Sequence, residues 1–115
     1  MRIRIALSLL FAIAMTAPAC AHAFLQHAVP GAGQMLAAPK EISLTFSEKL
    51  EPSLSGAGVM DAAGHDVSGL SATVKDAEIT VALPPLKPGL YHVTWHAVSV
   101  DSHRTEGGYT FTVTP

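Results

Sequence analysis

Alternation of apolar and polar residues with a period of two runs through much of this chain. Four stretches show it most clearly: EISLTFS (41–47), EITVALP (78–84), LYHVTWHAVS (90–99) and YTFTV (109–113). Successive side chains of a β-strand point to opposite faces, so each stretch would gather its apolar residues on one face. The pattern predicts half-buried strands of antiparallel sheets.

Turn-forming residues separate these strands at regular intervals. They are Pro30-Gly31, Ala63-Gly64, Pro84-Pro85 and Pro88-Gly89. Shorter strands are expected at 24–28, 58–61 and 70–74, and SEKLEPSLSG (47–56) allows one helical turn that Pro52 would stop. About seven short strands in so few residues predict an all-β domain, a β-sandwich or Greek-key barrel.

The first residues have the pattern of an export signal. Arg2 and Arg4 precede an apolar run over 5–15, and the small residues ACAHA (19–23) follow Pro18. This pattern predicts a secretory signal peptide over residues 1–21, cleaved to leave an exported chain that begins at His22. Cleavage before Phe24 and lipidation of Cys20 are the alternatives. The apolar run is too short to span a bilayer.

Residues 22–115 are then expected to form one small domain. The only cysteine, Cys20, leaves with the signal, so the domain has no disulfide. Five basic residues stand against nine acidic ones, a net charge of −4 with histidine neutral. This balance argues against nucleic acid as a partner and suits a cation.

Asp101 and His103 carry the most suggestive chemistry in the chain. They lie two residues apart after a strongly β-like run, in a loop that Gly107-Gly108 is expected to close. In an extended segment both side chains would share a face, which makes half of a site for a divalent metal. The alternative is an ordinary acid–histidine hydrogen bond in a polar loop.

His22 adds donors if cleavage makes it the first residue. It then offers an imidazole and an α-amine whose ordinary pKa is about 7.7–8.0, so a cation can displace the proton near neutrality. Together with Asp101 and His103 this gives a tetragonal set of nitrogen and oxygen donors, which favours Cu(II).

With these residues in view, the chain resembles the CopC family of periplasmic copper-binding proteins. The matching stretches are HAFLQHAVPGAG (22–33), ISLTFSEKLEP (42–52), LPPLKPGLYHVTWHAVSVDSH (83–103) and GGYTFTV (107–113). They cover nearly all of residues 22–115 in the family's order.

The resemblance implies an immunoglobulin-like or cupredoxin-like Greek-key fold that holds one Cu(II) in a site resembling a histidine brace. His22, Asp101 and His103 would be the ligands, and Glu48 matches an acidic family position as an outer or weak ligand. A CopD-type membrane protein is the implied partner, and the domain is expected to be a monomer. Only Met35 and Met60 follow the signal, so little Cu(I) affinity is expected.

Other histidines and other functions were weighed against this prediction. His27, His65, His92 and His96 are expected to be ordinary surface or loop residues. No nucleophile or phosphate-binding motif is present, so binding without catalysis is expected. A metal-free immunoglobulin-like interaction module is the main alternative, and a small histidine-brace copper oxidoreductase is a weaker one.

Overall fold

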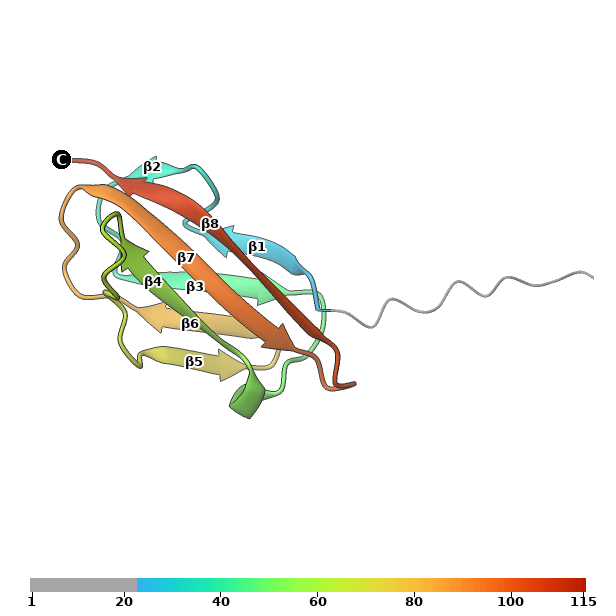
Figure 1. The fold of residues 1–115 in the computed structure, drawn as a ribbon. Helices are drawn as coiled ribbons and strands as arrows, with labels where there is room; N and C mark the ends of the chain where they lie inside the picture. The colour runs from blue at the N-terminus through green and yellow to red at the C-terminus, as the bar shows by residue number, and fades with distance from the viewer. Residues whose placement is uncertain (1–22) are drawn as a thin grey trace, which may run out of the picture.

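Two sheets make up the molecule in the computed structural model, which describes residues 23–115. Within these residues eight strands form two four-stranded sheets packed face to face (Figure 1). The first sheet has the order β1 (Leu25–Val29), β3 (Glu41–Phe46), β6 (Glu78–Ala82), β5 (Ala72–Lys75). The second has the order β2 (Met35–Leu36), β8 (Arg104–Val113), β7 (Gly89–Val98), β4 (Gly56–Asp61).

All paired strands run antiparallel except β2, which lies parallel to β8. The predicted all-β sandwich is therefore confirmed. One strand was missed because β2 is only two residues long, and such a short segment carries no alternation. The predicted domain 22–115 and the predicted signal peptide 1–21 stay predictions, since residues 1–22 lie outside the described part of the chain.

The core consists of the apolar residues that alternation assigned to the inner faces. Ile42, Leu44 and Phe46 of β3 are buried, and so are Ile79 and Val81 of β6. From the other sheet, Tyr91 and Val93 of β7 and Phe111 and Val113 of β8 face them. Burial of this apolar surface is the main favourable term in folding a domain without a disulfide.

Two aromatic contacts tie this core together. Phe46 of β3 meets Trp95 of β7 edge to face, with ring centroids 5.0 Å apart, and so links the two sheets. Tyr91 and Phe111 stack across the β7–β8 pair with centroids 5.6 Å apart. Such pairs add about 0.5–1.5 kcal/mol beyond the area they bury.

Gly107 and Gly108 correct one sequence prediction. They do not close a loop but lie inside β8, opposite Trp95 and Thr94. A Cβ at Gly107 would come within 2.7 Å of Trp95 Cζ2, and one at Gly108 within 2.7 Å of the Val93 carbonyl oxygen. These glycines are therefore needed for close packing, which a local pattern cannot distinguish from a turn.

The expected helical turn is present but displaced. It is a 3-10 turn at Pro52–Leu54, so Pro52 opens the turn and does not stop it. Proline suits the first position of a helical turn, because the missing N–H would have no partner there. The turn connects β3 to β4 at the same end of the sandwich as the β7–β8 loop (Figure 1).

Gly107→Ala is expected to lower the free energy of unfolding by about 1–3 kcal/mol, because the added methyl group must displace the Trp95 indole. Denaturant unfolding followed by the fluorescence of this single tryptophan measures the change. Gly31→Ala is the matched control, since its Cβ would make only ordinary contacts at 3.6 and 3.9 Å. Equal stability of the two variants would contradict the role given to Gly107.

Candidate metal centre

The loop between β7 and β8 brings Asp101 and His103 together. The Ser102 N–H donates to the Ser99 carbonyl at 2.8 Å, and the Ser99 N–H donates to the His103 carbonyl at 3.0 Å. Asp101 Oδ1 lies 3.4 Å from His103 Nδ1. The expected pairing of the two side chains is present, but the expected extended backbone is not: the segment is a tight turn with Ser102 at φ 74°.

Ser99 is a buried residue that stabilises this loop. It is 1% exposed, and its hydroxyl donates a short hydrogen bond to Asp101 Oδ1. This hydrogen bond is the largest cause of a lowered pKa for the Asp101 carboxyl, and His103 lowers that pKa further. The carboxyl group is therefore held in its ionised form, which is the form that coordinates a cation. No pattern in the sequence indicates this role of Ser99.

The segment after β3 runs alongside the same loop. Leu50 forms a β-bridge with Ser99, and the Val100 N–H donates to the Lys49 carbonyl at 3.1 Å. Glu48 is the exposed residue just before Lys49. Its backbone therefore lies close to the Asp101–His103 loop.

The first described residues lie against this end of the sandwich as well (Figure 1). Ala23 is fully buried, and its carbonyl accepts a 2.7 Å hydrogen bond from the Thr105 hydroxyl. Phe24 exchanges two hydrogen bonds with Ser47, each 2.8 Å long. Thr105 follows His103 by two residues, so the chain enters the fold next to the loop. His22 itself lies outside the described residues.

The donors found at this loop fit part of a copper site. Asp101 supplies carboxylate oxygen and His103 supplies imidazole nitrogen, both suited to Cu(II). Their side chains are 42% and 53% exposed, so an ion can reach them from solvent. Within residues 23–115 no three histidine, cysteine, aspartate or glutamate side chains form a group that could hold a metal. A complete site here needs a donor from outside these residues.

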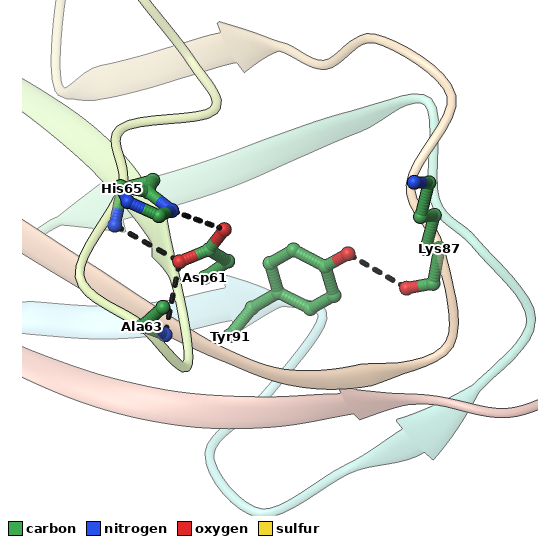
Figure 2. Close-up of polar contacts among 5 residues, drawn as sticks. All are labelled: Asp61, Ala63, His65, Lys87 and Tyr91. Atoms are coloured by element: carbon green, nitrogen blue, oxygen red, sulfur yellow. Dashed lines mark hydrogen bonds and ion pairs between the residues drawn. The ribbon is translucent and has the colours of Figure 1, made fainter.

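A second Asp–His pair lies where β7 begins, at the far end of that strand from the loop. Figure 2 shows His65 beside Asp61, with His65 Nδ1 3.4 Å from Asp61 Oδ2. The other carboxylate oxygen accepts the backbone N–H groups of Ala63 and His65, at 3.0 and 2.9 Å. These bonds close the turn after β4, and the His65 N–H is the main cause of a lowered Asp61 pKa. The pair therefore has a structural role in the turn.

The remaining histidines lie apart from the loop or point elsewhere. His27 on β1 and His92 on β7 are exposed. His96 is half-buried and lies over Gly56, where an added Cβ would be 3.1 Å from its Cε1 atom. The interpretation as surface histidines agrees with the positions of His27 and His92, whereas His96 is less exposed than expected.

Known proteins resemble this chain in sequence and in architecture. The CopC domain family matches residues 25–114, which is most of the chain. The chain belongs to the CopC family. It is 40% identical to protein YobA of Escherichia coli K12 over 96% of this chain and 94% of that protein. It is 41% identical to copper resistance protein C of Escherichia coli, over 83% of each chain.

The crystal structure of CopC from Methylosinus trichosporium OB3b agrees with the fold. It superposes with a TM-score of 0.76 at 37% identity, covering 82% of this chain and 95% of that one. The resemblance to the CopC family is thus confirmed, and family membership is consistent with copper binding. Among the described residues no helix is long and apolar enough to cross a membrane.

Ser99→Ala is expected to raise the pKa of Asp101 toward its ordinary value, because the variant lacks the hydrogen bond that most lowers it. A carboxyl whose pKa is lower in the folded than in the unfolded protein stabilises the fold at pH values above the unfolded pKa. This stabilisation is lost as the pH falls through the folded pKa. The variant should therefore lose less stability on acidification over that window.

Carbon-13 NMR titration of the Asp101 carboxyl in the copper-free protein measures the pKa directly. Ser53→Ala, at an exposed position of the 3-10 turn, is the control and should leave the titration unchanged. An unchanged Asp101 pKa in Ser99→Ala would remove Ser99 from this role.

Proposed function

We propose that this CopC-family chain is a periplasmic copper carrier that holds one Cu(II) through His22, Asp101 and His103. The observation that carries the proposal is the hydrogen bond between Thr105 and Ala23, 2.7 Å long. It fixes the residue that follows His22 next to the strand that follows His103. The proposed ligand His22 is the residue directly before Ala23 in the chain.

Cleavage after residue 21 completes the proposed donor set. His22 would then supply its α-amine and its imidazole, His103 a second imidazole and Asp101 an oxygen. Three nitrogens and one oxygen in a tetragonal arrangement suit Cu(II), which binds such donors more tightly than the other first-row divalent ions. Glu48 would be an outer or weak ligand beside this set.

Exposure of the loop supports a role in carrying copper over a role in catalysis. Asp101 and His103 are each about half exposed. A carboxylate in the donor set reduces the positive charge of the bound ion and occupies a coordination position. Copper is then the cargo, and the function is homeostasis, resistance or transfer to a CopD-type membrane partner by a monomeric protein.

His103→Ala and Asp101→Ala are each expected to weaken Cu(II) binding by more than about 100-fold, since even outer partners of metal ligands contribute 10- to 100-fold. Competition titration against a chelator of known affinity measures this. His65→Ala is the matched control, because His65 pairs with an aspartate at the same 3.4 Å separation. If His65→Ala weakened binding as much as His103→Ala, the assignment to the β7–β8 loop would be wrong.

One residue added ahead of His22 is expected to weaken Cu(II) binding, because the α-amine is moved away from the imidazole. Native mass spectrometry of the exported protein should show a chain that begins at His22 and carries one copper. Equal affinity of the extended and authentic proteins would exclude the amine as a ligand. A chain that begins at Phe24 would remove His22 from the site altogether.

A further inference from the structure

Two hydrogen-bonded anchors hold Ala23 and Phe24 in place, and each comes from a different sheet. Thr105 belongs to β8 of the second sheet and holds the Ala23 carbonyl. Ser47 directly follows β3 of the first sheet and pairs with Phe24 in both directions. The segment therefore bridges the two sheets at the end where the β7–β8 loop lies.

The Thr105 hydroxyl is the anchor nearest to the proposed copper site. Thr105 pairs with Ala97, whose side chain is fully buried, so its own side chain points into the sandwich at the edge of the core. There it meets a residue 82 positions away in the chain. Ala23 is fully buried, and a buried carbonyl left without a hydrogen-bond partner is costly.

We infer that Thr105 is a positioning residue for copper capture, which acts by fixing the backbone immediately after His22. The inference rests on the proposed function. Consecutive Cα atoms are about 3.8 Å apart, so an anchored Ala23 gives the proposed ligand before it in the chain a fixed starting point next to Thr105. Its donors are then ordered before the ion arrives, and binding loses less chain entropy.

The size of the effect follows from the backbone order that the Thr105 hydrogen bond provides before copper binds. Fixing one residue's backbone costs about 1–2 kcal/mol, which corresponds to a factor of about 5–30 in an equilibrium constant. Without the hydroxyl, this ordering must occur during copper binding. We therefore expect Cu(II) affinity to fall by about 5- to 30-fold, less than on loss of a ligand.

The test uses the processed protein that begins at His22 and the substitution Thr105→Val, which removes the hydroxyl and keeps the branched shape. Competition titration should show the 5- to 30-fold loss, and Thr105→Ser should restore most of the affinity. Thr94→Val is the control, because Thr94 lies exposed on the neighbouring strand of the same sheet. It should bind Cu(II) as the parent protein does.

A second readout is independent of copper. In the metal-free protein, amide hydrogen exchange at Phe24 should accelerate in Thr105→Val, while exchange in the centre of β8 should not change. Ser47→Ala, which removes the acceptor of the Phe24 N–H, should have the same two effects on exchange and on affinity. This variant tests the inference even if Thr105→Val folds poorly.

A His22→Ala background separates the two proposals. There Thr105→Val should cause a smaller further loss of Cu(II) affinity, since His22→Ala keeps only the α-amine of the two donors that the anchor positions. If His22→Ala weakens binding but Thr105→Val does not, the anchor is excluded and the proposed site remains. If Thr105→Val weakens binding equally in both backgrounds, its effect does not pass through His22 and the inference is wrong. If His22→Ala binds normally, both proposals are wrong.

Discussion

The pairing of β7 with β8 is the constraint on which the rest of this structure depends. Ten residue pairs join the two strands, from Gly89 with Val113 to Val98 with Arg104. A shift by one residue would turn the buried side chains of one strand to the outer face, and the Trp95 indole lies over Gly107, where a side chain would clash. With the register fixed, the chain must reverse after Val98, and Asp101 and His103 fall in that turn.

At the same end of the sandwich, backbone pairing and hydrogen bonds join the two sheets in addition to side-chain packing. Leu50 pairs with Ser99, and the segment at Ala23 and Phe24 is bonded to Thr105 of one sheet and to Ser47 beside the other. The β-framework thus brings segments that lie far apart in sequence to one end of the sandwich, while Asp101 and His103 stay exposed.

Sequence alone was enough for the fold class because β3, β6 and β7 have strict alternation and turn residues beside them. It was misleading wherever a distant contact decided the local structure. Gly107 and Gly108 have the composition of a turn, and only the Trp95 ring explains why they lie within a strand. The Asp101–His103 pairing was expected for the wrong reason, since the backbone turns at Ser102. The Thr105–Ala23 bond spans 82 residues, so no local pattern indicates it.

The two Asp–His pairs show why a motif does not define a site. Both have 3.4 Å between carboxylate oxygen and imidazole nitrogen, and both aspartates have a lowered pKa. The two pairs differ in the groups that donate hydrogen bonds to the carboxylate. Backbone N–H groups of Ala63 and His65 take one oxygen of Asp61 to close a turn, whereas the buried Ser99 hydroxyl is the main partner of Asp101. Beside Asp101 the chain also brings in the residue that follows His22. Because a metal needs several donors at one point, convergence of separate segments on one end of the fold distinguishes the candidate site from the turn.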